Sequence, residues 1–79
     1  FEAMKMSEHY LDVTGLKCPL PILRAKKALA ALACGDVLTV DATDAGAPDD
    51  FAAFCRQTGH VLLASEEREG VFRLVIRHK

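Results

Sequence analysis

The sequence has little that would stabilise an extracellular fold or recognise nucleic acid. Its 79 residues include three cysteines, one tyrosine and no tryptophan. An odd number of cysteines without a CxxC pair does not make a disulfide framework, and we see no secretory h-region or apolar run of membrane length before them. The formal net charge of -1 gives a polyanion no general attraction to the chain. We therefore expect a cytoplasmic protein without a membrane segment, for which direct nucleic-acid binding is unlikely.

The length and composition are typical of one small globular domain. Hydrophobic residues make up 51% of the chain and charged residues 27%, with no low-complexity tract. Met4 and Met6 both resemble start residues, so we expect residues 1–8 to be a disordered or cloning-derived N-terminus. Residues 9–79 are then expected to form a single domain, because a chain of this size supports one hydrophobic core.

Strand and helix patterns alternate along the chain. The β-branched and apolar runs predict strands, and the segments with apolar residues three and four apart predict helices. The predicted elements are strand 9–14, helix 19–32, strand 37–42, helix 48–58, a strand from 61, and strand 71–77, with residues 66–70 joining the last two.

The first predicted helix is amphipathic. Ile22, Ala25, Leu29 and Leu32 form its apolar stripe, and Gly35 is expected to end it. The order β-α-β-α-β-β makes the first two strands parallel and places both helices together. The predicted fold is an α/β (α+β) two-layer sandwich, with a four-stranded mixed sheet and two helices on one face.

The chemistry is concentrated at Cys18, immediately before the first helix. In an N-cap position its thiolate would accept a hydrogen bond from the Leu20 N–H and lie at the positive end of the helix dipole. Lys17, and Arg24 further into the helix, would add positive charge. The sequence therefore predicts a modestly activated, exposed thiol, which suits group transfer between proteins.

Two prolines shape the start of this helix. Pro19 and Pro21 lack N–H groups and stiffen the first turn. A residue before proline avoids the α region, so Leu20 either lies in the helix under mild strain or belongs to an extended entry with the helix starting at Pro21.

The other reactive side chains have simpler interpretations. Cys55 is expected to be buried. Cys34 is either an exposed loop thiol or a resolving partner for Cys18, although a helix of about 20 Å between them argues against a disulfide. Asp44 either caps a turn or sets the loop beside Cys18. The basic residues Lys17, Arg24, Lys26 and Lys27 form either a solvated helix face or a docking patch for acidic partners.

The histidines do not have the spacing of metal ligands. His9, His60 and His78 are expected to cap, pack or face solvent, so we predict no metal and no cofactor. No histidine lies close to Cys18 in sequence, and a hydrolase built on a Cys/His pair is therefore unsupported.

Several segments together resemble a known family. They are Leu11-Asp12, Gly15-Leu16-Lys17-Cys18-Pro19-Leu20-Pro21, Ala42-Thr43-Asp44 and Phe54-Cys55-Arg56-Gln57-Thr58-Gly59-His60. From about Tyr10 to Arg77 the chain resembles the TusA-like, or SirA-like, sulfur carriers, with a CPxP motif at the strand-to-helix junction. The resemblance implies a two-layer sandwich and a persulfide on Cys18. It further implies sulfur relay from a cysteine desulfurase or other donor to a downstream acceptor protein, in tRNA thiolation, molybdenum-cofactor or related pathways.

Two other classes of function remain open at this point. A thiol-based redox-sensing or regulatory adaptor would use the same Cys18 to form a sulfenic acid or mixed disulfide. A nucleic-acid-binding module is the weaker alternative, because the charge is near neutral and aromatic residues are few. As a carrier, the chain would be a sulfurtransferase component without independent turnover rather than a complete enzyme.

Overall fold

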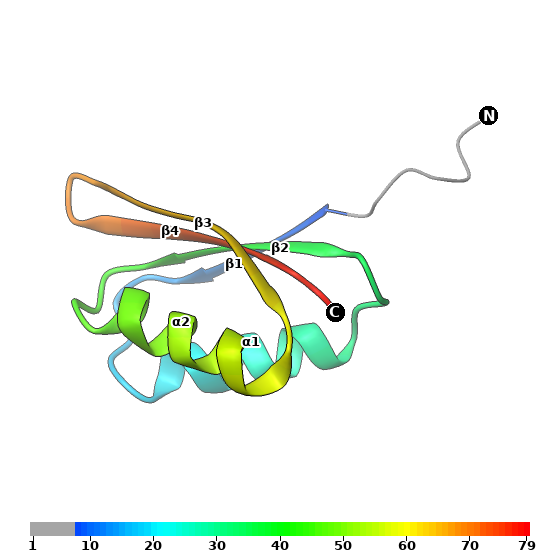
Figure 1. The fold of residues 1–79 in the computed structure, drawn as a ribbon. Helices are drawn as coiled ribbons and strands as arrows, with labels where there is room; N and C mark the ends of the chain where they lie inside the picture. The colour runs from blue at the N-terminus through cyan, green and yellow to red at the C-terminus, as the bar shows by residue number, and fades with distance from the viewer. Residues whose placement is uncertain (1–7) are drawn as a thin grey trace.

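The computed structural model describes residues 8–79 as two layers, a sheet and a pair of helices (Figure 1). In chain order the elements are β1 (Glu8–Val13), α1 (Leu20–Ala30), β2 (Val37–Ala42), α2 (Ala47–Thr58), β3 (Val61–Arg68) and β4 (Val71–Arg77). The expectation of a disordered or cloning-derived N-terminus falls on residues outside the described range, except that Glu8 is the first residue of β1.

The sheet is mixed, with the strand order β1-β2-β4-β3. β1 pairs with β2 in parallel, and the β2–β4 and β3–β4 pairs are antiparallel. Both helices cover the same face of this sheet (Figure 1). The predicted β-α-β-α-β-β sandwich is confirmed, as is the interior position of the second strand.

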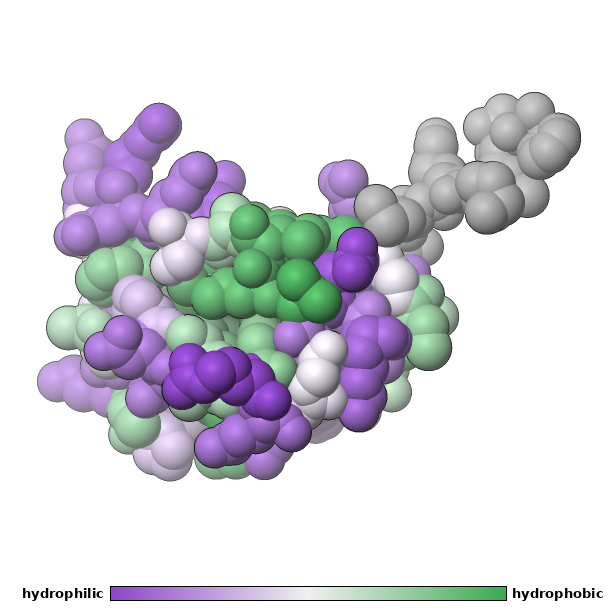
Figure 2. Space-filling model, viewed as in Figure 1, coloured by the Kyte–Doolittle hydropathy of each residue, from purple (hydrophilic) through white to green (hydrophobic). Residues whose placement is uncertain are grey.

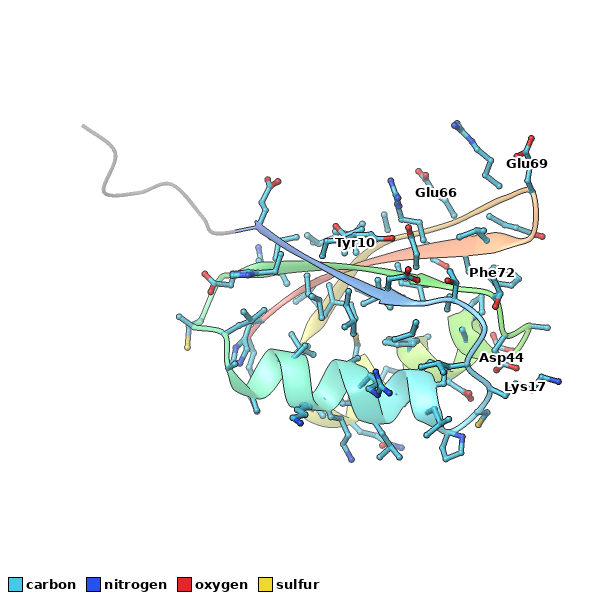
Figure 3. The ribbon with its side chains drawn as sticks, turned by 180° about the vertical axis from the view of Figure 1, so that it is seen from behind. Tyr10, Lys17, Asp44, Glu66, Glu69 and Phe72 are labelled. Carbon is cyan, nitrogen blue, oxygen red and sulfur yellow. The ribbon has the colours of Figure 1, made fainter. Side chains whose placement is uncertain are left out.

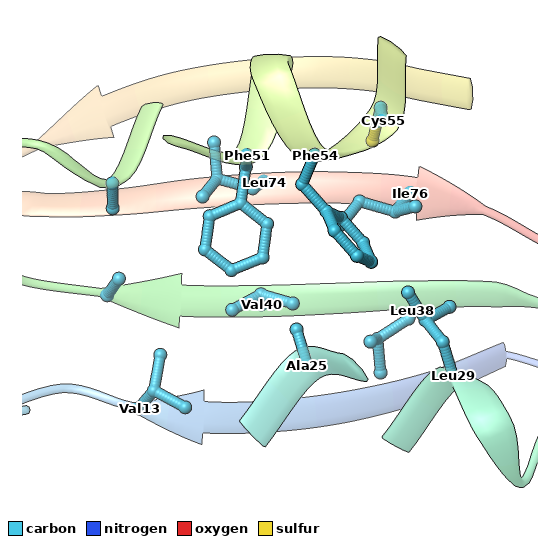
Figure 4. Packing of buried hydrophobic residues seen from close by; sticks show 12 residues of the cluster. Val13, Ala25, Leu29, Leu38, Val40, Phe51, Phe54, Cys55, Leu74 and Ile76 are labelled. Carbon is cyan, nitrogen blue, oxygen red and sulfur yellow. The ribbon is translucent and has the colours of Figure 1, made fainter. Parts of the chain in front are cut away.

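The hydrophobic core lies between the sheet and the helices (Figure 4). Phe51 from α2 is fully buried, and its ring meets that of Phe54 edge to face at a centroid distance of 6.5 Å. Ala25 and Leu29 bring the predicted apolar stripe of α1 into the same cluster. The sheet contributes alternate residues of each strand, since period-two side chains reach one face only. They include Val13, Leu38, Val40, Ala42, Leu74 and Ile76.

The end of α1 differs from the prediction. The helix ends at Ala30, not near Leu32, and Gly35 is not its cap. The Ala31 and Leu32 N–H groups bond to carbonyls only three residues back, which tightens the last turn. Gly35 instead takes a φ of +88° in a separate turn that leads into β2.

The β3–β4 hairpin is longer and its turn tighter than the sequence indicated. β3 continues to Arg68, which pairs with Val71, so only Glu69 and Gly70 form the turn. Both have positive φ, as a two-residue turn of the primed type requires. The pairing also shifts by one residue between Leu62 and Ala64, which marks a bulge.

The start of β3 carries exposed apolar side chains. The exposed large hydrophobic residues of this strand are Val61 and Leu63. Figure 2 shows an apolar patch on this side of the molecule. Within residues 8–79, no helix is long and apolar enough to cross a membrane.

Candidate functional site

The loops after β1 and β2 meet at one edge of the sheet. Because these strands are parallel, their carboxyl ends lie side by side, and α1 and α2 both begin just beyond them. The Gly15 N–H donates to Thr43 Oγ1 at 2.8 Å, which ties the two loops together. Gly15 adopts a φ of +82°, a conformation that glycine takes without steric cost. This junction holds the segment that contains Cys18.

Cys18 is an exposed free thiol just before α1. The sequence predicted Cys18 as the N-cap residue, and this prediction is wrong. Pro19 occupies the N-cap position, and no side chain caps the helix. The Leu20 N–H donates to the Lys17 carbonyl at 2.8 Å and is therefore not available to the sulfur. The Cys18–Pro19 peptide bond is cis.

The helix itself starts at Leu20, with Pro21 in its first turn. Of the two alternatives for Leu20, the structure has the helical one. The Leu23 N–H donates to the Pro19 carbonyl at 3.1 Å, which closes the first helical turn. Pro21 is fully buried, whereas Leu20 and Leu23 keep 43% and 51% of their surface exposed. An apolar surface thus lies close to the thiol in sequence, on the first turn of the helix.

The electrostatic environment of Cys18 is the reverse of the predicted one. A hydrogen bond to the Asp50 carboxylate, with smaller contributions from desolvation and from the negative charges of Asp50 and Asp44, raises the pKa of the Cys18 thiol. A carboxylate accepts hydrogen bonds and repels a neighbouring thiolate, so it favours the protonated sulfur. Lys17 and Arg24 do not contribute to the shift.

Asp44 and Asp50 approach the same point in space at the start of α2. A Cβ atom on Gly46 would lie 3.3 Å from Asp44 Oδ2 and 3.7 Å from Asp50 Oδ2. Gly46 precedes the helix, and its carbonyl accepts the Asp50 N–H at 3.0 Å. The Ala47 N–H donates to the Asp44 carbonyl at 3.0 Å. The glycine leaves room for two half-buried carboxylates at the loop beside Cys18.

The structure brings together some of the predicted supporting residues. Lys17 and Asp44 lie at the same end of the molecule (Figure 3). Lys17, Pro19 and Arg24 are exposed, and Pro21 packs inside. The negative charge of Asp44 makes the smallest contribution to the raised pKa of the Cys18 thiol.

The other cysteines and the histidines lie apart from this group. Cys55 is buried, as predicted, and its burial raises the pKa of its thiol. Cys34 is an exposed free thiol in the turn before β2. His60 packs between Phe54 and His78, with ring centroids 5.7 and 4.6 Å away. Among residues 8–79, no three His, Cys, Asp or Glu side chains are placed to hold a metal ion.

Known proteins resemble this chain in sequence and in fold. The family model described as sulfurtransferase TusA matches residues 9–78. This chain belongs to the TusA family. A protein of Neisseria meningitidis serogroup A, provisionally named as a sulfur carrier protein, is 73% identical over 74 residues, which are 94% of this chain and 100% of that protein. The sulfur carrier protein TusA of Allochromatium vinosum is 55% identical over 67 residues, covering 85% and 88% of the two chains.

A solved structure also resembles this TusA-family chain. The crystal structure of the SirA-like protein from Desulfitobacterium hafniense matches with a TM-score of 0.79 and 31% identity. The match covers 87% of this chain and 95% of that one. The predicted resemblance to TusA-like and SirA-like proteins is confirmed.

Sequence reasoning missed two residues of the site. Asp50 had no predicted role at the site, and Thr43 entered only within the segment Ala42-Thr43-Asp44 that carries the family resemblance. Thr43 accepts a hydrogen bond from Gly15, 28 positions away in sequence, and Asp50 raises the pKa of Cys18 from a separate helix. A strand or helix pattern does not reveal such long-range relations. The one local signal was position, since Thr43 directly follows β2 and Asp50 lies in the first turn of α2.

A second polar cluster lies on the opposite face of the sheet. Arg73 donates from Nε and from a terminal guanidinium nitrogen to the Asp41 carboxylate, both at 2.8 Å, and the Tyr10 hydroxyl donates to it at 2.7 Å. The Arg73 guanidinium is the main cause that lowers the pKa of Asp41. Figure 3 shows Tyr10 and Glu66 across the sheet from Lys17, so this cluster is separate from the cysteine.

Proposed function

We propose that this chain is a cytoplasmic sulfur carrier that holds sulfane sulfur as a persulfide on Cys18. The observation that supports this most directly is the exposed free thiol of Cys18 before α1, in a chain whose relatives are named sulfur carrier proteins. A carrier needs its sulfur reachable by other proteins rather than enclosed in a pocket. These relatives support the carrier role and give no support to a redox-sensing adaptor.

The transfer is an exchange in which atoms and electrons balance. Cys18 Sγ attacks the outer sulfur of a donor persulfide, and a new S–S bond forms as the bond between that sulfur and the donor cysteine breaks. The donor cysteine leaves as a thiolate and takes up a proton equivalent to the one that Cys18 lost. Attack by an acceptor thiolate on the terminal sulfur then returns Cys18 as a thiol. No external oxidant or reductant is consumed.

The residues around Cys18 have supporting roles in this proposal. Pro19 and Pro21 stiffen the segment that presents the sulfur. Lys17, just before α1, and Arg24, within α1, are both exposed and would meet acidic groups of a partner. Asp44 belongs to the carboxylate pair beside the cysteine loop.

The partners follow from the carrier role in general terms. A carrier requires a sulfur donor, for which we propose a cysteine desulfurase or another persulfide enzyme, and a downstream acceptor protein. Acceptors in tRNA thiolation, molybdenum-cofactor or related sulfur pathways are consistent with the family. In this role the chain is a sulfurtransferase component that is loaded and unloaded, without turnover of its own.

Mass spectrometry of the intact protein tests the proposal. The protein is incubated with a cysteine desulfurase and cysteine, and its mass is compared with that of Cys18→Ser treated in the same way. We expect the parent to gain the mass of one sulfur atom, reversibly on reduction, and Cys18→Ser to gain none. Cys34→Ser is the matched control, because it removes the other exposed thiol and should load like the parent.

A further inference from the structure

The face of the sheet that the helices leave uncovered is hollowed beside the β3–β4 hairpin. The hollow has a volume of about 640 Å³, and Asp41, Arg73 and residues 66–69 of the hairpin line it. A second hollow of about 350 Å³ reaches β1, where Tyr10 lines it. Arg73 borders both hollows, so together they form one groove across the sheet, here called the sheet-face groove. Cys18 lines neither part.

A fixed ion pair forms the base of this groove. Asp41 is buried, and its carboxylate accepts hydrogen bonds from Arg73 at 2.8 Å and from Tyr10 at 2.7 Å. Asp41 and Arg73 are direct cross-strand partners, and Glu66 is the next partner on β3. These positions alternate with the core residues Val40 and Leu74, so their side chains point to the uncovered face. Because a bidentate guanidinium–carboxylate pair is directional, the groove has a defined shape.

The hairpin end of the sheet-face groove has an excess of negative charge. Four carboxylates and two guanidiniums line it, from Asp41, Glu66, Glu67, Glu69, Arg68 and Arg73. Arg73 is bonded to Asp41, and within residues 8–79 neither Glu66 nor Glu69 forms a salt bridge. Both glutamates are exposed. The complementary ligand is therefore a lysine or arginine side chain, whereas a nucleic-acid phosphate would be repelled.

The hairpin turn lies at the end of the molecule that holds the cysteine loop. Val13, the last residue of β1, pairs with Ala42, the last residue of β2, and Ala42 pairs with Phe72 of β4. The cysteine loop leaves β1 from this row, and residues 68–71 of the hairpin extend past it on the same side. Figures 1 and 3 both show the hairpin turn at the end where α1 and α2 begin. A protein bound at the cysteine loop is thus placed to reach the groove.

We propose that the sheet-face groove docks a basic, extended segment of the protein that delivers sulfur to Cys18. The proposal rests on the carrier role and adds the chemistry of the partner. In this structure Cys18 is a free thiol, which is the form that a sulfur donor must bind. Lysine or arginine side chains of the donor pair with Glu66 and Glu69 while its persulfide meets Cys18 around the end of the sheet. Contacts between exposed charges mainly speed the encounter and weaken in salt.

The rate of sulfur loading from a cysteine desulfurase tests this docking. Initial rates are measured against the concentration of the carrier, for the parent and for the double variant Glu66→Gln/Glu69→Gln. We expect the double variant to raise KM severalfold at low salt and to leave kcat unchanged, because a lost docking contact weakens binding without altering the reacting sulfur. The difference in KM should shrink as salt is added.

Ala30→Lys/Gln57→Lys is the matched control. It changes the net charge by the same amount, at exposed positions in the last turns of α1 and α2, away from the end that holds Cys18. Lysine is favourable near a helix C-terminus, so the control should fold. We expect it to load with the KM of the parent. Equal KM values for the control and for Glu66→Gln/Glu69→Gln would overturn the proposal.

Binding to the groove is measured separately with a defined probe, a short peptide of alternating lysine and valine that is acetylated and amidated. It is added to ¹⁵N-labelled protein, and the amide signals are followed. We expect the signals of residues 66–73 and of Tyr10 to shift, and the shifts to diminish in Glu66→Gln/Glu69→Gln. Shifts confined to other parts of the chain, or equal shifts in the parent and the double variant, would contradict the proposal.

The two experiments distinguish failure of the docking from failure of the carrier role. Normal loading on Cys18 with a KM that the double variant does not change would refute the docking and leave the carrier role intact. A parent that binds the peptide in the groove and never gains sulfur would refute the carrier role and, with it, the sulfur donor as the docked protein.

Discussion

Phe51 provides a quantitative test of how the site is supported. Its side chain is fully buried at the start of α2, against Phe54 and the sheet, and directly follows Asp50. Replacing a buried phenylalanine by alanine typically costs about 3–5 kcal/mol, from lost burial and from the cavity left behind. A chain of 79 residues has a total stability of about 4–12 kcal/mol at roughly 0.05–0.15 kcal/mol per residue. Phe51→Ala should therefore remove about a quarter or more of the stability.

Urea unfolding followed by circular dichroism measures this loss. With a slope of about 1 kcal/mol per molar urea for so small a chain, the midpoint should fall by about 3 M or more. Leu23→Ala is the control, since Leu23 is 51% exposed and a surface change of this kind usually stays within about 0.5 kcal/mol. If Phe51→Ala and Leu23→Ala unfold at similar urea midpoints, Phe51 is not the buried core residue that the structure shows.

Two further predictions concern stability. The Arg73 guanidinium holds the pKa of Asp41 below its usual value, so the unfolded chain binds more protons than the folded one and stability rises with pH. That contribution should be present above the ordinary carboxyl pKa of about 3.9 and lost as the pH falls through the lower folded value. Melting temperatures recorded from neutral to acidic pH should show this fall, and Arg73→Leu should flatten it; a curve unaffected by Arg73→Leu would contradict the assignment. Gly59 caps α2 at a φ of +91°, so Gly59→Ala should cost about 1–2 kcal/mol in a urea titration, and no loss would show that the cap is not left-handed in solution.

The sequence predicted the fold well because its patterns were local. The apolar stripe with Ala25 and Leu29 marked the face of α1 that is buried, and the continuous run of β2 marked a strand paired on both sides. The errors lie where contacts in the folded chain decide at which residue an element ends. Gly35 has the conformation expected of a helix cap, but tight three-residue hydrogen bonds end α1 earlier. The extent of β3 depends on its pairing with β4, which the charged residues near Glu66 do not reveal.

At the candidate site, too, the local features were predicted and the features that depend on distant residues were not. The position of Cys18 at a strand-to-helix junction was readable from the strand pattern at 9–14 and the amphipathic pattern that follows Pro19. Its electrostatics were not, because the prediction used only neighbours in sequence, Lys17 and Arg24. The largest cause that raises the pKa of the Cys18 thiol is Asp50, which belongs to a different helix, α2. The predicted N-cap role of Cys18 was wrong for a local reason, because the Leu20 N–H already donates to the Lys17 carbonyl.

The most direct test of the central claim is the mass of the intact protein after exposure to a cysteine desulfurase and cysteine. The account predicts one added sulfur on the parent and on Cys34→Ser, removed by reductant, and none on Cys18→Ser. Fragmentation of the loaded protein should place the added sulfur on Cys18. A parent that gains no sulfur, or a Cys18→Ser variant that gains as much as the parent, would contradict the assignment of Cys18 as the carrier residue.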